Sequence, residues 1–260
     1  MWGSQAYWKN YVSDEFYETF HVFLHKQLNW KIYKHGMKVD ILLFVEAYSA
    51  VCSNFHSLKK NNLVGTIVLF VDDLHWVNKK MRQQKLKAFQ LPGVVIMSTY
   101  ANQAAQLYPE IDTSKWIWMP HAASRRFIQP SINTTATLQS ILLTGATSSM
   151  WYPHRAKAAK LGGESGLVTQ ILHPGYQKST EKEQKQFVMR MVHFGMGLTD
   201  GSSLHYALAK IFEIPATGQL LLLNDEMEAH MRNLCFVPGV HYIGYNENNM
   251  KNIKDYHGKI

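Results

Sequence analysis

A loop with hydroxyl, carboxylate and glycine residues stands between an apolar run and a helical stretch near position 200. Thr199 or Asp200 can cap the following helix, and Gly201 lets the backbone approach a ligand closely. The amides of Gly201, Ser202 and Ser203, in the first turn of that helix, would then attract an anion such as a diphosphate. The alternative is an ordinary helix N-cap that binds no ligand.

The helix expected over 202–214 carries three polar side chains at intervals of four and then three residues. This spacing places Tyr206, Lys210 and Glu213 on one face. Their apolar neighbours are typical of a core, and Pro215 is expected to end the helix. A buried carboxylate needs a partner, and a sugar diol is one such partner. A Lys–Glu pair on the surface is the alternative.

The segment 210–218 reads Lys-Ile-Phe-Glu-Ile-Pro-Ala-Thr-Gly and precedes an apolar run. It resembles the signature of group 1-type and CgeB-like glycosyltransferases of the two-Rossmann-domain (GT-B) kind, in which Glu-x-x-Ala-x-Gly precedes a strand. The segments 119–127, 172–176 and 236–245 resemble further parts of the same family. The resemblance covers roughly residues 115–250, whereas the first hundred residues match only in their α/β rhythm.

The resemblance implies a nucleoside-diphosphate sugar as substrate and no cofactor. It implies that Glu213 binds the ribose hydroxyls and that the amides of residues 201–203 hold the diphosphate. It also implies four further donor contacts. Gly145 forms a tight turn and Arg155 supplies a cation near the phosphate, while Gly175 and Tyr176 lie near the base. Arg155 as a surface helix residue and Tyr176 as a loop aromatic are the alternatives. With Tyr206 and Lys210, these residues form the expected donor site.

One position departs from the family. Many retaining members have a second glutamate eight residues before the first, and here that position is His205. The stereochemical outcome of the transfer is therefore left open.

Catalytic candidates follow an apolar run in the first half of the chain. Asp73 and His75 come directly after the run 66–71, and the carboxyl ends of parallel strands face the ligand cleft. A histidine can act as a general base near neutral pH. The alternative is a capping Asp followed by a histidine at a helix start. Glu46 is a weaker candidate, and His121 is interpreted as structural.

No metal is expected, because helix-terminus amides with Arg155 or Lys210 would stabilise the leaving diphosphate.

The elements that position these residues alternate along the chain. Continuous apolar runs indicate parallel strands buried on both faces, and the helical stretches between them supply the crossovers. In the first half the runs are 39–45, 66–71, 94–97 and 116–119, separated by helical stretches at 46–60, 76–90 and 101–108. An amphipathic helix is expected over 14–34.

A second array follows the break at 120–137. Its runs are 140–144, 167–172, 195–198, 219–223 and 240–243, with helical stretches at 154–161, 181–192, 202–214, 225–232 and 248–255. Neither half has a dinucleotide fingerprint or a Walker A loop. We therefore expect an α/β protein of two Rossmann-like domains facing a cleft. Residues 1–125 form a reduced acceptor-side domain, and residues 126–260 bind the nucleotide sugar.

Composition fits a globular protein of 260 residues, with 46% hydrophobic and 18% charged residues. Cys52 and Cys235 supply neither a disulfide framework nor a zinc motif. There is no signal-peptide apolar region and no run near the ~18 apolar residues of a membrane helix. A cytoplasmic protein is expected.

The net charge of +8 is spread over short clusters, which we interpret as solvated helix faces. It suits an anionic nucleotide sugar, or an acceptor at a membrane surface with peripheral association of the protein. The acceptor (glycan, protein or lipid) and the oligomeric state are left open, and no nucleic acid is expected. Two alternatives remain: an inactive relative that only binds the nucleotide sugar, and a basic nucleic-acid-binding α/β protein. The chain looks short for a complete transferase.

Overall fold

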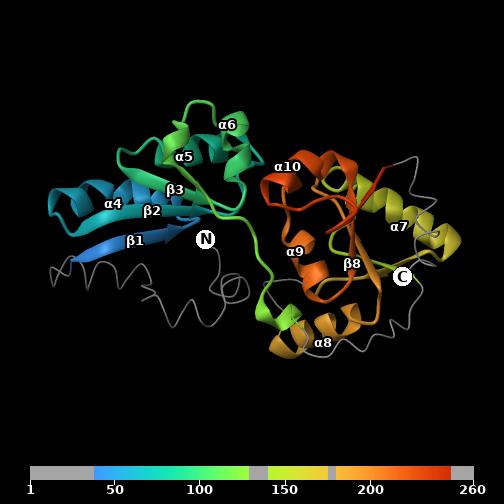
Figure 1. Cartoon of the computed structure of the whole chain (residues 1–260). Coiled ribbons are helices and arrows are strands. Elements are labelled where there is room, and N and C mark those ends of the chain that lie inside the picture. Colours follow the sequence, from blue (N-terminus) through green and yellow to red (C-terminus); the bar gives the residue numbers. More distant parts are fainter. Residues whose placement is uncertain (1–37, 129–139, 175–179, 247–260) are drawn as a thin grey trace. The chain divides into compact units, whose positions relative to one another are not determined.

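The computed structural model of the chain describes residues 38–128, 140–174 and 180–246 (Figure 1). The chain divides into two compact units, Met1–Pro120 and His121–Ile260. Several sequence-based predictions lie outside the described residues: the helices over 14–34 and 248–255, the polar run 131–137, and the donor contacts Gly175 and Tyr176.

The first unit contains a parallel four-stranded sheet in the order β1-β2-β3-β4. The four apolar runs predicted for this half all form strands: β1 Val39–Val45, β2 Val64–Val71, β3 Val94–Ser98 and β4 Trp116–Trp118. Burial on both faces is correct for β2 but wrong for the start of β1, where Ile41 is 65% exposed. β1 is an edge strand of the described sheet, with a hydrogen-bonded neighbour on one side only.

Two helices on one face connect these strands. Helices α4 (Tyr48–Lys60) and α5 (Lys79–Phe89) contact each other, as expected when strands follow in sequential order and every crossover has the same hand (Figure 1). Helix α5 begins at Lys79 because the Asn78 side chain accepts a hydrogen bond from the Met81 amide at 2.9 Å. The stretch predicted at 101–108 forms η2 (Ala101–Gln103) and α6 (Ala104–Leu107), and η3 (Thr113–Lys115) precedes β4.

The second unit contains a parallel five-stranded sheet in the order β6-β5-β7-β8-β9. Its strands are β5 Ile141–Thr144, β6 Val168–Ile171, β7 Met196–Thr199, β8 Leu220–Asn224 and β9 Ile243–Tyr245. From β5 the chain moves to β6 on one side and then returns to β7 on the other. The strand order therefore reverses between β5 and β7, which makes this a doubly wound sheet with a topological switch point.

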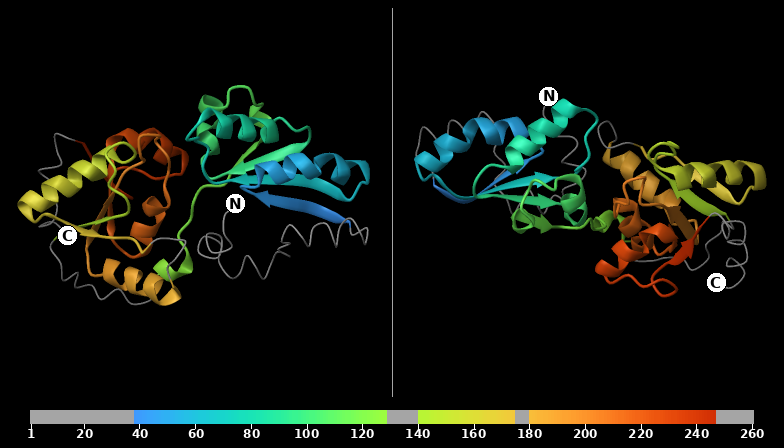
Figure 2. Two further views of the ribbon diagram at one scale, coloured as in Figure 1. Left: turned by 180° about the vertical axis from the view of Figure 1, so that it is seen from behind. Right: turned by 90° about the horizontal axis from the view of Figure 1, so that it is seen from above.

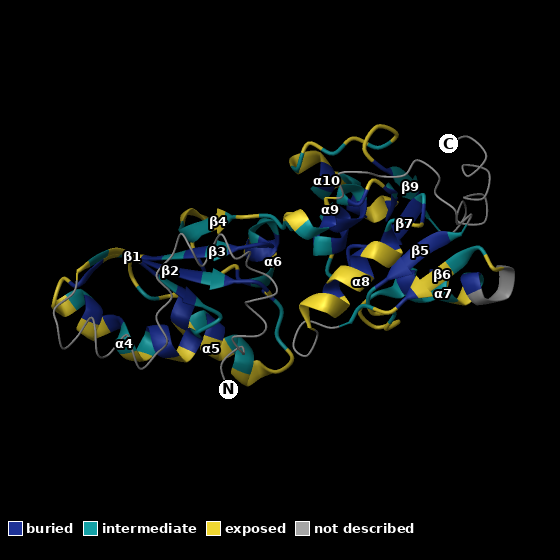
Figure 3. Ribbon diagram, turned by 90° about the horizontal axis from the view of Figure 1, so that it is seen from below, coloured by how far each residue is buried: buried dark blue, intermediate teal, exposed yellow. Residues whose placement is uncertain are grey.

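Helices cover both faces of this sheet. On one face, Ala158 of α7 (Pro153–Ser165) packs in a core with Leu143 and Leu198. The opposite core joins Leu142 to Phe187 and to other residues of α8 (Glu181–Met191), α9 (Ala209–Ala216) and α10 (Glu228–Asn233) (Figures 1 and 2). Successive residues of β5 point to opposite faces, so both cores share this buried strand (Figure 3). The short helices η4 (Arg125–Phe127) and η5 (Asp225–Met227) complete the unit.

The prediction of one helix over 202–214 is wrong in its first half. Helix α9 begins at Ala209, and residues 201–208 form a loop with turns. The Ser202 hydroxyl accepts a hydrogen bond from the Leu204 amide at 3.2 Å. Such short polar side chains give the backbone an alternative to helical bonding. Pro215 lies in the last turn, and the helix ends at Ala216.

The last strand lies later than predicted, at 243–245 instead of 240–243, since Gly239 has a left-handed φ of +77° and Val240 is exposed in the turn. Among the described residues, no helix has the length and apolar character needed to cross a bilayer.

Candidate functional site

The carboxyl ends of β5 and β7 meet at the switch point of the second unit. Leu143 pairs with Leu198, so Thr144 and Thr199 end the two strands side by side. Gly145 follows with a left-handed φ of +97°, and a Cβ atom there would lie 2.8 Å from the Arg155 guanidinium. A glycine is therefore needed for this turn and for the close approach of the arginine.

Arg155 is buried at the start of α7, so its interpretation as a surface helix residue is wrong. Its Nε atom lies 3.0 Å from Asp200 Oδ1, and its backbone amide donates to Asp200 Oδ2 at 3.2 Å. Its guanidinium also stacks over the Tyr152 ring at 4.2 Å. Asp200 is fully buried. The first turn of α7, where a helix attracts an anion, thus already holds a carboxylate of the protein.

The amides of residues 201–203 are hydrogen-bonded within the protein. They donate to Asn224 Oδ1 at 3.2 Å, to Asp200 Oδ1 at 3.3 Å and to the Trp151 carbonyl at 2.8 Å, respectively. The prediction that they are free amides of a helix start is wrong, because α9 begins eight residues after Gly201. Gly201 has a different role, since any Cβ atom there would overlap the Met227 sulfur.

Lys210 and Glu213 form an ion pair on α9, and both residues are 5% exposed. The surface-pair interpretation is therefore wrong, and the partner that the buried carboxylate needs is Lys210. The Lys210 ammonium lies 5.2 Å from the centre of the Phe187 ring and 5.9 Å from that of Phe127. Tyr206 is buried in the loop before α9 and shares no helical face with this pair, contrary to the prediction.

His173 follows β6 and lies beside the Lys210–Glu213 pair. Burial lowers its pKa to about 4, and the positive charge of Lys210 acts in the same direction. Its ring packs edge-on against Phe187 at 4.8 Å. Sequence reasoning did not select His173, although it stands in the segment 172–176 that resembles the family.

A second polar cluster lies at the carboxyl ends of β5, β7 and β8. The Glu226 carboxylate in η5 contacts two imidazoles through its Oε2 atom: His154 Nε2 at 3.2 Å and His205 Nε2 at 3.3 Å. The Asn224 amide donates to the same oxygen at 3.4 Å. The His230 ring stacks on His205, with ring centres 6.3 Å apart. Of these residues, sequence reasoning singled out only His205. His154 and Glu226 each follow a predicted strand, and that position was the signal that could have identified them.

The electrostatics of this cluster favour an ionised carboxylate. Burial by itself would raise the pKa of Glu226, but the hydrogen bonds and charges of His154 and His205 bring that pKa below its ordinary value. Burial and the neighbouring His205 lower the pKa of His230.

In the first unit, polar residues gather at the carboxyl ends of β1, β2 and β3. Glu46 has a left-handed φ of +50°, and its Oε1 atom accepts from the Asp72 amide at 2.6 Å. Tyr48 donates to the other oxygen of Glu46, and Thr99 donates to Asp72 Oδ1 at 3.1 Å. Burial raises the pKa of Glu46, while the charge of Lys85 opposes this rise.

Asp73 and His75 lie close together in the loop after β2, with 3.6 Å between Asp73 Oδ1 and His75 Nδ1. The Asp73 side chain is 52% exposed and that of His75 is 28% exposed, so a ligand can reach both. His121 is partly buried in the second unit.

Lys85 holds the loop that carries Asp73 and His75. Its ammonium donates to the carbonyl oxygens of both residues, at 2.9 Å for His75. The interpretation of Lys85 and Lys87 as a solvated helix face is wrong for Lys85, which is fully buried. Burial lowers its pKa. The helical spacing of Lys85 with the buried Ala88 and Phe89 was the signal that sequence reasoning missed.

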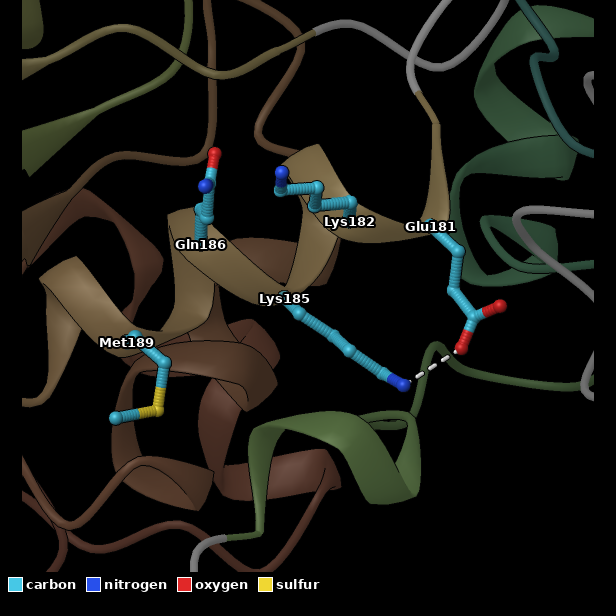
Figure 4. A pocket seen from close by; sticks show the side chains of 5 residues that line it. All are labelled: Glu181, Lys182, Lys185, Gln186 and Met189. Carbon is cyan, nitrogen blue, oxygen red and sulfur yellow. Dashed lines mark ion pairs between the residues drawn. The ribbon is translucent and has the colours of Figure 1, made fainter.

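A hollow on the second unit lies outside these clusters. All of its lining residues belong to α8, where Glu181 and Lys185 form an ion pair at 2.8 Å (Figure 4). It contains none of the predicted site residues. In the described parts of the chain, no three His, Cys, Asp or Glu residues are arranged to hold a metal ion.

No family model matches the chain, and no curated protein matches it in sequence. Among solved structures, the chain is similar to the crystal structure of a glycosyltransferase from Rickettsia africae ESF-5. The TM-score is 0.55 at 12% sequence identity, and the match covers 90% of this chain and 70% of that one. At this identity the likeness concerns the fold alone, an α/β fold of parallel sheets. It does not single out the group 1-type or CgeB-like family.

Proposed function

We propose that the chain is a glycosyltransferase that moves a sugar from a nucleoside diphosphate to an acceptor. One observation carries the proposal: charged and polar side chains from the loops after β5, β7 and β8 gather at the switch point of a doubly wound sheet. Ligands of such sheets bind outside the carboxyl ends of the strands at this point. The fold likeness to a glycosyltransferase supports the same activity. The two-domain GT-B arrangement, with residues 1–125 on the acceptor side and 126–260 on the donor side, is part of the proposal.

In the donor site, Glu213 accepts hydrogen bonds from the ribose hydroxyls, and Lys210 faces the phosphates. The support for these roles is the burial of both charged groups beside Phe127 and Phe187. Hydrogen bonds to a charged group are stronger than neutral ones, and a site with little water strengthens them further. Lys210 and Glu213 pair with each other in the free protein. When the donor binds, Glu213 contacts the ribose hydroxyls and Lys210 the phosphates.

The other predicted donor contacts remain proposals, but several of these groups already have partners inside the protein. Arg155 shares its charge with Asp200, so a phosphate at Gly145 would have to compete with that carboxylate. The amides of residues 201–203 would reach a diphosphate only if the loop 201–208 rearranged. Tyr206 and Ser203 belong to the same loop. Gly175 and Tyr176 remain the proposed contacts to the base and lie outside the described residues.

On the acceptor side, Asp73 and His75 are the proposed catalytic residues. His75 takes the proton of the acceptor hydroxyl, and Asp73 orients the imidazole from 3.6 Å. Lys85 positions both through their carbonyl oxygens. The acceptor remains a glycan, protein or lipid, and the reaction is proposed to take place in the cytoplasm without a metal ion.

One observation favours a second candidate, a relative that binds nucleotide sugars without turnover. Arg155 and the amides of residues 201–203 are all engaged inside the protein. A hydrolysis assay with UDP-glucose, GDP-mannose and ADP-glucose separates the two, because many transferases slowly hydrolyse their donors.

Substitution of Glu213 tests the donor site. Glu213→Gln removes the charge and keeps the shape, and we expect donor affinity in calorimetry to fall by 10-fold or more, about 1.5–3 kcal/mol. The donor is first selected by a thermal-shift screen with UDP, GDP, ADP and their sugars. Glu181→Gln on the exposed face of α8 is the matched control and should bind normally. Unchanged affinity in Glu213→Gln would contradict the assignment.

A further inference from the structure

Glu226, His154, His205 and His230 form one cluster, in which the carboxylate determines where the protons of the contacting imidazoles lie. A carboxylate only accepts hydrogen bonds, so the two imidazoles that contact Oε2 through Nε2 each carry a proton on that atom. Glu226 therefore holds the two histidines in a fixed orientation and places a negative charge beside each ring.

The two histidines differ in exposure. The His154 side chain is 12% exposed at the start of α7, whereas that of His205 is 46% exposed. A ligand at the carboxyl ends of the strands can therefore contact His205 with little rearrangement. His154 contacts the same carboxylate from the interior and helps to fix its position.

The loop between β7 and α9 holds His205 in an uncommon backbone conformation. His205 has a φ of +53° and Ser202 a φ of +62°, both in the left-handed region that non-glycine residues rarely occupy. The loop is fixed by hydrogen bonds from the Tyr206 amide to the Gly201 carbonyl and from the Ser203 amide to the Trp151 carbonyl. Residues held in such conformations are strained and are concentrated at functional sites.

Titratable groups from three other elements face His205. Glu226 comes from η5, His230 from α10 and His154 from α7, and all three meet at the carboxyl ends of the central strands. His230 is stacked on His205 and neutral at neutral pH, so the charge of Glu226 is the nearest opposite charge. The arrangement is an exposed imidazole with an orienting carboxylate behind it, the relation that makes a histidine an efficient proton carrier.

We propose that His205 is the catalytic residue on the donor side, a general acid that contacts and protonates the departing diphosphate, and that Glu226 is its positioning residue. This inference rests on the proposed function. The bond between the anomeric carbon and the diphosphate oxygen breaks, and its electron pair leaves with that oxygen. The acceptor oxygen forms the new bond to the anomeric carbon and loses its proton to His75. Nδ1–H of His205 donates a proton to the diphosphate, which balances the proton taken up by His75.

The test uses the full chain and the nucleotide sugar, among UDP-glucose, GDP-mannose and ADP-glucose, that the protein turns over. His205→Asn is the variant of choice because asparagine tolerates a left-handed backbone. We expect kcat to fall about 10²–10⁴-fold, with KM changed only a few-fold, and the decline of kcat at high pH to disappear. A structural role would not remove one limb of the pH profile.

Glu226→Gln provides the second variant. It keeps the size of the side chain but removes the charge that favours the protonated imidazole. The pH at which kcat declines should therefore move downward by about one unit, with a smaller loss of kcat at low pH. His193→Gln and Glu228→Gln are exposed controls in the same unit and should leave the profile unchanged.

The outcomes distinguish this inference from the proposed function. If no donor is bound or turned over by the unsubstituted protein, the proposed function fails and this inference fails with it. If the unsubstituted protein turns over a donor and His205→Asn keeps its kcat and pH profile, only the role of His205 is overturned. Loss of kcat in His205→Asn with an unshifted profile in Glu226→Gln would overturn the positioning role of Glu226.

Discussion

Three basic residues in the described part of the chain are buried together with their acceptors. Lys85 is bound by carbonyl oxygens, Arg155 by Asp200 and Lys210 by Glu213. Burying a charge is costly unless it is paired, and removing one partner of such a pair typically costs about 3–5 kcal/mol. The Arg155–Asp200 and Lys210–Glu213 pairs each carry no net charge, so their burial does not lower the net charge of +8.

The titration of His173 gives a prediction at the residue scale. Its pKa is about 4 in the folded protein and near 6.5 in the unfolded chain, so the unfolded state binds the proton first as the pH falls. The free energy of unfolding should therefore decrease between pH 6.5 and pH 4, by up to about 2–3 kcal/mol from this residue. Urea unfolding at pH 7 and pH 4.5 measures the decrease.

His173→Gln should lack this part of the decrease, because glutamine does not titrate. His193→Gln, which replaces an exposed histidine of the same unit, should behave like the unsubstituted protein. An equal decrease in the His173→Gln and unsubstituted proteins would show that His173 is not the responsible group.

At the scale of elements, the loop between β7 and α9 decides the geometry of the proposed donor site. Its glycine fits against η5, where a Cβ atom at position 201 would overlap the Met227 sulfur. The fully buried Met227 also packs in the core with α8 and α9. Close packing of this loop on η5 is therefore what brings His205 to Glu226.

A double-mutant cycle tests this packing. Gly201→Ala should destabilise the protein by about 1–3 kcal/mol, because overpacked side chains force shifts in the structure. The effect should be much smaller in a Met227→Ala background, where the space is open. Denaturant unfolding measures all four proteins.

Gly166→Ala is the control for the cycle. Gly166 has a φ of +66° and open space around its Cβ position, so its cost comes from the backbone alone. Met227→Ala should not change that cost. Additive effects of Gly201→Ala and Met227→Ala would contradict the proposed contact.

For the molecule as a whole, the two units carry separate sheets, and the second unit has cores on both faces of its sheet. All the described residues of the proposed donor site lie in this second unit. We therefore predict that residues 121–260, produced alone, fold and bind the donor. The affinity should lie within a few-fold of that of the full chain, while turnover with an acceptor should be lost.

Calorimetry on the fragment and on the full chain measures this difference. The fragment with Glu213→Gln is the control, and it should lose affinity as the full chain does. A folded fragment without donor affinity would contradict the placement of the donor site in the second unit.

The sequence predicted the helices and strands better than it predicted which side chains contact one another. All nine apolar runs form strands, eight of them within two residues of the expected bounds. Helix α9 was predicted too long, because Tyr206, Lys210 and Glu213 have helical spacing while hydrogen bonds of Ser202 and Gly201 favour turns before Ala209. Gly145 was correctly expected in a tight turn. The burial of Arg155 was not visible, since its acceptor Asp200 is supplied by a distant part of the sequence.

The sequence by itself determined the α/β class, the parallel strands and the order of elements, because apolar periodicity is a local property that burial imposes on each segment. Only the tertiary structure decided which polar groups meet. Arg155 and Asp200 are 45 positions apart, and His154 and Glu226 are 72 positions apart. They come together because parallel strands bring their carboxyl ends to one edge of the sheet, and the reversed strand order selects which ends are neighbours. The contact between His205 and Glu226, on which the proposed donor-side acid depends, is a consequence of that order.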